Sequence, residues 1–359
     1  MKFNLQKFRR LPIPSQNEIM KLWSSNEIEV SVICLAYNHE KYLEDAIRGF
    51  LIQKTNFSFE IIIHDDASSD GTPNIIEFYE NRYPKIIKSI RQKKNQYSKL
   101  PNSILSIAFK KATGKYFSLC EGDDFWIHPD KLAIQKTIIE SEINCSLVVH
   151  NAYTLKNETV INVFRKNIKY QIFGVKEIIK YYGQFSPTAS YFFKRQLIEV
   201  LPHWFDKASV GDILVELYSQ KIGTGVYLPE YFSVYRINSV NSWSVSRTST
   251  PEGRAKSFTS LILMFTKILP DFPQFKAEIN SRILYCYEIV AYQICGYKFI
   301  NSLKGEKIMK YNLIRNEVIK IKGFEHDITP LSFPNRLIFF SVFSVIRLSI
   351  KKLKAYLSF

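Results

Sequence analysis

The sequence predicts an α/β protein with a mostly parallel central sheet that is covered by helices on both faces. Apolar runs typical of buried strands alternate with segments whose apolar residues recur at helical spacing. Three of the apolar runs end in polar or acidic residues. In an open α/β sheet, ligands bind in the crevice beyond the carboxyl ends of the parallel strands. We therefore expect these polar groups to meet at one edge of the sheet.

The first two strands and their helices follow this pattern in order. An apolar strand at 30–35 runs into Ala36, Tyr37 and Asn38, and residues 40–53 then carry apolar side chains at helical intervals. The second strand ends in Asp65 and Asp66. A helix from 74 to about 82 follows, for which Thr72 is a good N-cap and Pro73 fits the first helical position.

The third strand end is the most acidic part of the chain. The apolar run 116–120 leads directly into Glu121, Asp123 and Asp124. Carboxylates at a buried strand end repel one another and lose hydration, so they are tolerated there mainly when a divalent cation or a hydroxyl-rich ligand compensates them. A solvated acidic turn is the alternative. The second acidic strand end, at Asp65 and Asp66, favours a ligand site.

Together these segments resemble the family 2 glycosyltransferases, nucleotide-sugar enzymes of the GT-A fold. The resemblance covers residues 29 to about 245 and rests on segments in the family's order and spacing. These segments are 30–33 with Tyr37 and Asn38, 65–72, 112–116, 121–126, 210–212 and 228–236. It implies a GT-A sheet with a nucleotide-sugar-binding half at 29–135 and an acceptor-binding half at 136–245, preceded by an N-terminal extension at 1–28.

The resemblance implies a donor site at the strand ends. Asp66 matches the aspartate that accepts a hydrogen bond from the nucleotide base, and Leu35 and Tyr37 lie beside it. Tyr37 could equally pack over the end of its strand. Arg236 suits the diphosphate through its planar fork of donors, and Lys99 could approach the same group.

The acidic strand end matches the family's metal motif. The resemblance implies that one of the two residues Asp123 and Asp124 reaches the ribose or the metal. The other would coordinate Mg²⁺ or Mn²⁺. Glu121 opens the motif where aspartate is more usual. Asn238 stands where related sequences often carry histidine, and a neutral amide is a poor ligand, so a third protein ligand is in doubt.

The general base is expected at Asp212. It follows Gly211, begins an apolar-periodic stretch and matches the family's base position; a simple helix cap is the alternative. Trp243 could stack on a sugar face or simply pack, and Thr188 is a candidate acceptor contact. The sequence thus indicates inverting transfer from a nucleotide-diphosphate sugar, with UDP-sugar favoured, to a hydroxyl of a glycan or glycolipid in bacterial surface-polysaccharide assembly. A catalytically silent protein that binds sugar nucleotides or anionic surfaces is the alternative.

Composition bounds the location and partners of the 359-residue chain, whose net charge is +16. Nucleic acid is an unsuitable partner, because no nucleic-acid module is recognisable and an acidic pocket repels phosphates unless it holds metal. The cysteines lack CxxC spacing, which is consistent with reduced thiols in the cytosol, and the N-terminus lacks the apolar core of a signal peptide. The cysteines are Cys34, Cys120, Cys145, Cys286 and Cys295.

The C-terminal third is predicted to be helical and basic. Residues 250–359 carry 17 basic and 8 acidic side chains, and helices are expected at 257–269, 277–303 and 307–321 within a helical region at 246–335. Residues 336–359 would form a helix with a narrow basic stripe and a broad apolar face. Such a helix suits the cytosolic face of a membrane, as in a peripheral protein. Docking on the domain or on a homodimer partner is the alternative.

Overall fold

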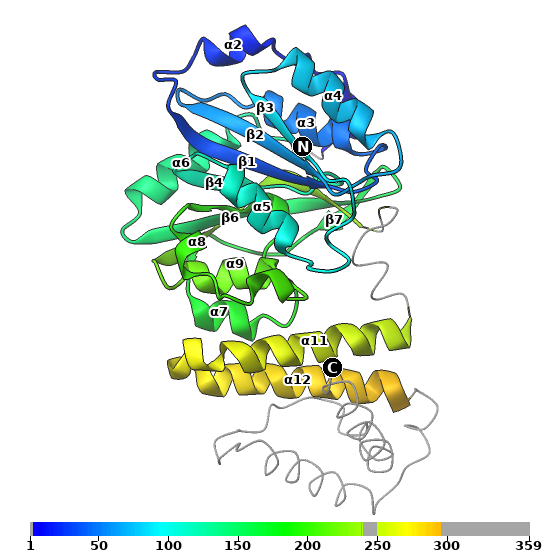
Figure 1. The fold of residues 1–359 in the computed structure, drawn as a ribbon. Helices are drawn as coiled ribbons and strands as arrows, with labels where there is room; N and C mark the ends of the chain where they lie inside the picture. Colours follow the sequence, from blue (N-terminus) through cyan, green and yellow to red (C-terminus); the bar gives the residue numbers. More distant parts are fainter. Residues whose placement is uncertain (1–2, 238, 240–249, 296–359) are drawn as a thin grey trace, which may run out of the picture. The chain divides into compact units, whose positions relative to one another are not determined.

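The protein is an α/β structure in which a mixed sheet is covered by helices on both faces, as predicted (Figure 1). The computed structural model describes residues 3–237, 239 and 250–295. The chain divides into two compact units, 1–241 and 242–359. All the strands of the ten-stranded sheet belong to the first unit, so the two halves expected at 29–135 and 136–245 share one sheet.

The strands lie in the order β3-β2-β1-β4-β9-β6-β10-β5, with β7 paired to β6 and β8 to β10. The first four in the chain, β1 to β4, pair in parallel, as do β6 and β10, whereas β5, β7, β8 and β9 pair antiparallel with their neighbours. The strands are β1 (Ile28–Ala36), β2 (Ser58–Asp65), β3 (Ile87–Arg91), β4 (Tyr116–Leu119), β5 (Phe125–Trp126), β6 (Cys145–Lys156), β7 (Thr159–Val163), β8 (Gln171–Phe173), β9 (Phe192–Lys194) and β10 (Thr224–Arg236).

Strand β2 is buried at every position, which is consistent with the apolar run Ile61, Ile62 and Ile63 at its centre. Its register places Asp65 beside Ala36 of β1, and the N–H of Asp66 donates to the carbonyl of Ala36 at 3.0 Å. The first two predicted strand ends therefore lie next to each other.

Helices cover the sheet from both sides. In Figure 1, α3 and α4 are grouped on one side of the blue strands, and α5, α8 and α9 lie on the other. Helix α3 can approach β5 closely because position 49 is glycine: a Cβ there would lie 2.5 Å from the carbonyl oxygen of Trp126. The helices of the first unit are α1 (Leu5–Arg9), α2 (Gln16–Met20), α3 (Leu43–Leu51), α4 (Thr72–Arg82), α5 (Ser103–Lys111), α6 (Lys131–Ser141), α7 (Val175–Lys180), α8 (Leu197–Val200) and α9 (Asp212–Ser219), with 3₁₀ turns at Thr188–Ser190 and Phe205–Lys207.

The start of α4 differs from the prediction. Thr72 is the first helical residue and not the N-cap, which is Gly71. The hydroxyl of Thr72 is used elsewhere, since it accepts the N–H of His39 at 2.8 Å. Asp70 takes the capping role: its carboxylate accepts the N–H groups of Thr72 at 3.0 Å and Glu40 at 3.1 Å.

The N-terminal extension packs against the sheet through α1. The ring of Phe8 lies 5.1 Å, and that of Phe3 5.8 Å, from the ring of Phe125 in β5, centroid to centroid. Helix α2 begins with a capping box between Ser15 and Glu18. The extension is therefore attached to the strand that directly follows the acidic motif.

The described part of the second unit is a helical pair, α11 (Pro251–Ile268) and α12 (Lys276–Cys295), joined by 3₁₀ turns at Leu269–Asp271 and Pro273–Phe275. Helix α11 begins six residues before the predicted start at 257. Two predicted helices, 307–321 and 336–359, lie outside the described residues. Residues 296–303 of the helix predicted at 277–303 also lie outside them. No described helix has the length and apolar character needed to cross a bilayer. Cys34, Cys120, Cys145 and Cys286 are buried free thiols, as predicted.

Candidate active site

The acidic motif is held at the end of β1 by backbone hydrogen bonds. The N–H of Cys120 donates to the carbonyl of Ile33 at 3.0 Å, and the N–H of Gly122 donates to the carbonyl of Leu35 at 2.8 Å. A Cβ at 122 would lie 2.8 Å from Nδ1 of His39, so the imidazole would have to move to admit a side chain there. Leu35 thus contributes its backbone to the placement of the acids.

Asp124 is a buried carboxylate with one unsatisfied oxygen. Its side chain belongs to a residue that is only 2% exposed. Oδ1 accepts the N–H of Arg236 at 2.7 Å, whereas Oδ2 is buried and has no hydrogen-bond donor among the residues that the structure describes. Burial, with the nearby charge of Asp123, raises the pKa of Asp124 well above its usual value. A positive partner is needed if this carboxylate is to be charged.

Three acidic residues besides Asp124 affect one another through their charges: Glu121, Asp123 and Asp212. Burial, together with the charges of Asp123 and Asp212, raises the pKa of Glu121 to about 8. Asp212, at the start of α9, is therefore near enough to Glu121 to affect its pKa, although it comes from a distant part of the chain. Asp123 accepts a hydrogen bond from the hydroxyl of Ser239 at 2.6 Å. The arrangement concentrates negative charge in a partly buried position.

Asp212 is not the N-cap of α9, which is Gly211. It is the first residue of α9, and its Oδ1 accepts the N–H of Ile213 at 2.7 Å. Burial raises its pKa above the usual value for aspartate. A carboxylate with a raised pKa is a better proton acceptor at neutral pH than an ordinary one.

The donor set suits a hard divalent cation in part. Carboxylate oxygens are the ligands that Mg²⁺ and Mn²⁺ prefer, and the free Oδ2 of Asp124 is one such oxygen. Within the described ranges, however, no three Asp, Glu, His or Cys side chains already meet as a metal site. Phosphate oxygens of a nucleotide would therefore have to complete the coordination. Asn238 lies outside the described residues.

Asp66 is placed at the predicted strand end but already has backbone partners. It is 1% exposed, and its two carboxylate oxygens accept the N–H groups of Gln96 at 2.7 Å and Tyr97 at 2.9 Å. It therefore holds the segment that follows β3 against the end of β2. Tyr37 is 40% exposed, so its ring is available to stack on a flat ligand.

Two predicted diphosphate contacts have contrasting surroundings. Lys99 is exposed, close in sequence to the segment that Asp66 holds. The guanidinium of Arg236, by contrast, donates to the carbonyl of Asp123 at 2.6 Å and to the carboxylate of Asp45 at 2.5 Å. Its donors are directed to the protein itself. Arg236 thus holds the acidic motif in this structure.

The predicted acceptor region contains a buried acid that the sequence pattern did not reveal. Oε1 of Glu216 in α9 accepts the N–H and hydroxyl of Ser186 at 3.1 and 2.6 Å and the hydroxyl of Tyr191 at 2.7 Å. It lies one helical turn after Asp212 and anchors both ends of the segment that carries the partly exposed Thr188. Trp243 lies outside the described residues. Glu216 could have been noticed as the one acid within the apolar stretch of α9.

Comparison with known proteins identifies the family. Residues 31–198 match the family model Glycosyl transferase family 2. This matched region belongs to family 2 of the glycosyltransferases. It contains the acidic motif and the predicted donor residues Leu35, Tyr37, Asp66 and Lys99, whereas Arg9, Asp212 and Arg236 lie outside it.

The relatives of this glycosyltransferase match it over part of their length. An uncharacterised protein of Mycobacterium tuberculosis is 36% identical over 121 residues, and the alignment covers 34% of each chain. The chain therefore spans about a third of the length of these first relatives. An Escherichia coli relative is 29% identical over 136 residues, 38% of this chain and 50% of the relative. It is described as a UDP-Glc:α-D-GlcNAc-diphosphoundecaprenol β-1,3-glucosyltransferase.

Solved structures share the fold. Staphylococcus aureus TarS 1–349 in complex with UDP-GlcNAc has a TM-score of 0.56 at 17% identity, covering 88% of this chain and 99% of that one. The mannosyltransferase of Pyrobaculum calidifontis in complex with GDP-Man and Mn²⁺ has a TM-score of 0.53 at 14% identity, covering 89% and 87%. The predicted GT-A fold is confirmed.

Proposed function

We propose that this nucleotide-sugar-dependent glycosyltransferase moves a sugar from a UDP-sugar to a hydroxyl of a glycan or lipid-linked saccharide, with inversion at the anomeric carbon. The observation that carries the proposal is the buried, unsatisfied Oδ2 of Asp124 beside Glu121 and Asp123. Binding of a cation together with a diphosphate would account for an acidic cluster of this kind. The UDP-GlcNAc complex of TarS and the name of the E. coli relative support a UDP-sugar and a lipid-linked acceptor.

In this proposal, Asp123 and Asp124 hold Mn²⁺ or Mg²⁺, and Glu121 adjusts the charge of the pair. A bound cation supplies positive charge that offsets the negative charge developing on the leaving diphosphate. Tyr37 stacks on the base, while Asp66 keeps segment 96–97 in place beside it. Asp66 could also meet the base, because a carboxylate has lone pairs beyond the two used here.

Asp212 is the proposed general base. Its carboxylate accepts the proton of the attacking acceptor hydroxyl, so that the oxygen can attack the face of the donor sugar opposite the diphosphate. Glu216 holds Ser186 and Tyr191, on either side of Thr188, which is the proposed acceptor contact. The proposed proton acceptor thus comes from the part of the chain that follows the family match.

Nucleotide release from a panel of nucleotide sugars tests the proposal. We expect turnover of one UDP-sugar with Mn²⁺ and loss of turnover with EDTA. Adding undecaprenyl-diphosphate-linked N-acetylglucosamine should increase the rate and give a new glycosidic product. Turnover of only a GDP-sugar would overturn the nucleotide assignment, and turnover that resists EDTA would overturn the metal assignment.

We further propose that residues 336–359 attach the enzyme to the cytosolic face of an anionic membrane. The support is sequence pattern: basic and polar side chains recur at three- and four-residue steps on an otherwise apolar segment. They are Ser341, Ser344, Arg347, Lys351 and Lys354. Co-sedimentation with anionic vesicles should be lost when 336–359 are deleted, with turnover of a water-soluble acceptor retained. Absence of binding by the full-length chain would contradict this.

A further inference from the structure

Two arginines from opposite ends of the first unit share one buried carboxylate. Asp45, in α3, is 4% exposed and lies within an apolar helix face. Arg9, in α1, donates to Asp45 through Nε at 3.0 Å and through a terminal nitrogen at 2.8 Å. Arg236, at the end of β10, donates to the same carboxylate at 2.5 Å. A single acid thus links the N-terminal extension to the last strand.

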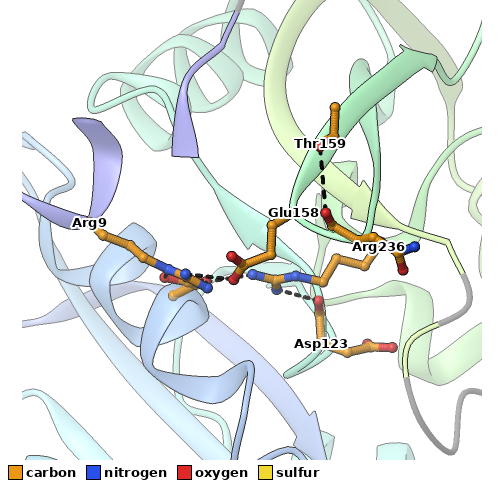
Figure 2. Close-up of polar contacts among 7 residues, drawn as sticks. Arg9, Asp123, Glu158, Thr159 and Arg236 are labelled. Carbon is orange, nitrogen blue, oxygen red and sulfur yellow. Dashed lines mark hydrogen bonds and ion pairs between the residues drawn. The ribbon is translucent and has the colours of Figure 1, made fainter. Parts of the chain in front are cut away.

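Arg236 carries this link to the acidic motif by two hydrogen bonds. One guanidinium nitrogen donates to the carbonyl of Asp123, and the backbone N–H donates to Oδ1 of Asp124. The guanidinium also lies over the rings of Phe125 and Tyr42, at 4.5 and 5.1 Å from their centroids. Figure 2 shows Arg236 directed toward Asp123, with Arg9 on the other side.

Arg9 is held from two sides. Its other terminal nitrogen donates to Glu158, in the turn between β6 and β7, at 2.7 Å (Figure 2). Glu158 is exposed and contacts the arm of Arg9 that faces away from Asp45, whereas the Asp45 contacts are partly buried. Exposed ion pairs contribute little, while charge-assisted hydrogen bonds in buried positions fix geometry. The contact with Asp45 is therefore the one that can transmit position.

We propose that Arg9 is a positioning residue for the Asp123–Asp124 pair, acting through Asp45 and Arg236. When Arg9 is present, Asp45 divides its hydrogen bonds between two guanidinium groups, which sets the place of Arg236. Arg236 in turn sets the carbonyl of Asp123 and orients Asp124 so that Oδ2 is left for a ligand. The N-terminal extension, although outside the family match, thereby helps to form the site. This inference rests on the proposed metal-binding function of that site.

Hydrogen exchange of the metal-free protein tests the positioning directly. Arg9→Met should speed exchange of the amides in 120–126 about 10-fold, because the motif loses its indirect support. Asp45→Asn keeps the sequence of α1 but weakens the contacts of both Arg9 and Arg236, so it should have the same effect. Glu158→Gln is the matched control, because it removes the charge at the exposed contact of Arg9 and should leave exchange of 120–126 unchanged. Wild-type exchange in both Arg9→Met and Asp45→Asn would overturn the proposal.

Mn²⁺ titration in the presence of UDP gives the functional measurement. Arg9→Met and Asp45→Asn should weaken Mn²⁺ binding by about 3- to 10-fold, and Glu158→Gln should not change it. An equal loss of thermal stability in all three variants with unchanged Mn²⁺ affinity would show a purely structural bridge and refute the inference. If the wild type itself binds no Mn²⁺ with UDP or GDP, the proposed metal role fails. The exchange measurement then still decides whether Arg9 positions the motif.

Discussion

Two buried carboxylates of the first unit, Glu60 and Asp124, differ in their hydrogen-bond donors and in the direction of their pKa shifts. Glu60, in β2, is 0% exposed, and its oxygens accept from Ser31, Thr113 and Lys88 at 2.6 to 2.8 Å. Burial acts to raise the pKa of Glu60, but these donors together lower it below the usual value. Asp124 has one backbone donor and a bare oxygen, and its pKa is raised.

The contrast separates a structural acid from an acid prepared for a ligand. The fold supplies Glu60 with donors from two strands and a loop, so nothing outside the chain is needed to stabilise its charge. At Asp124 the chain places further acids instead. Unsatisfied buried polar groups in native proteins call for an explanation, and a missing ligand is a common one. Substitutions of these and neighbouring acids test the contrast between Glu60 and Asp124.

The largest effect is expected from Asp124→Asn. A neutral amide keeps the shape of the side chain but loses the charge that a hard cation needs, so metal-dependent turnover should be abolished. Steady-state assays over a range of Mn²⁺ concentrations measure this, and circular dichroism checks the fold. Turnover retained at wild-type metal concentrations would remove Asp124 from the site.

Asp212→Asn should reduce sugar transfer by ~100-fold or more while leaving donor binding near wild type, because it removes the proton acceptor and not a donor contact. Comparison of transfer rates with the dissociation constant of the donor separates the two effects. A collapse of donor affinity would make Asp212 a donor-binding or structural residue.

Glu216 is an intermediate case. It accepts three hydrogen bonds, yet burial and the charge of Asp212 raise its pKa to about 8. The folded state therefore holds a proton that the unfolded state, with an ordinary pKa of ~4.3, has released. Its stabilising effect is complete below the unfolded value and declines as pH rises toward 8, by up to ~1.4 kcal/mol per pH unit.

Glu216→Gln should remove this decline. Urea unfolding of both proteins at pH 5, 6, 7 and 8 gives the difference in free energy of unfolding, which should shrink or change sign toward higher pH. A difference that is independent of pH would show that Glu216 is already charged at pH 5, like Glu60.

A smaller effect is expected from Glu60→Gln. The amide can no longer hold the charge of Lys88 or accept from all its present donors, so the free energy of unfolding should fall by ~2 kcal/mol. The affinity for Mn²⁺ with UDP should stay unchanged once the protein is folded. A change in Mn²⁺ affinity at a temperature where the variant is fully folded would show that Glu60 is not a purely structural acid.

Most of the sheet could be predicted because its evidence is local. Strand β2 and helix α3 are apparent from their own apolar spacing, and Glu121, Asp123 and Asp124 stand out because acids seldom follow a buried strand. Asp212 comes from a distant segment of the chain, and its candidacy as general base rests on the family resemblance. The start of α4 was misplaced by one residue because the Thr72 hydroxyl is taken by a distant N–H.

The rest depends on contacts between distant segments. Arg9 and Arg236 meet at Asp45, and nothing in the local pattern of α1, α3 or β10 indicates a shared partner. An acid in an amphipathic helix is usually a surface residue, so the burial of Asp45 and Glu216 was not predicted. Asp66 likewise lies at the predicted strand end. Its hydrogen bonds come from Gln96 and Tyr97, in a loop whose conformation the sequence does not predict.

The most direct test of the central claim is the thermal stability of wild type, Asp124→Asn and Glu60→Gln, each with UDP and with or without Mn²⁺. If the bare oxygen of Asp124 is a metal ligand, Mn²⁺ at 100 times its dissociation constant should stabilise wild type and Glu60→Gln by ~2.7 kcal/mol. Asp124→Asn should gain nothing. An equal gain in all three proteins would contradict the claim that Asp124 holds the cation, and no gain in wild type would contradict a metal site at this edge of the sheet.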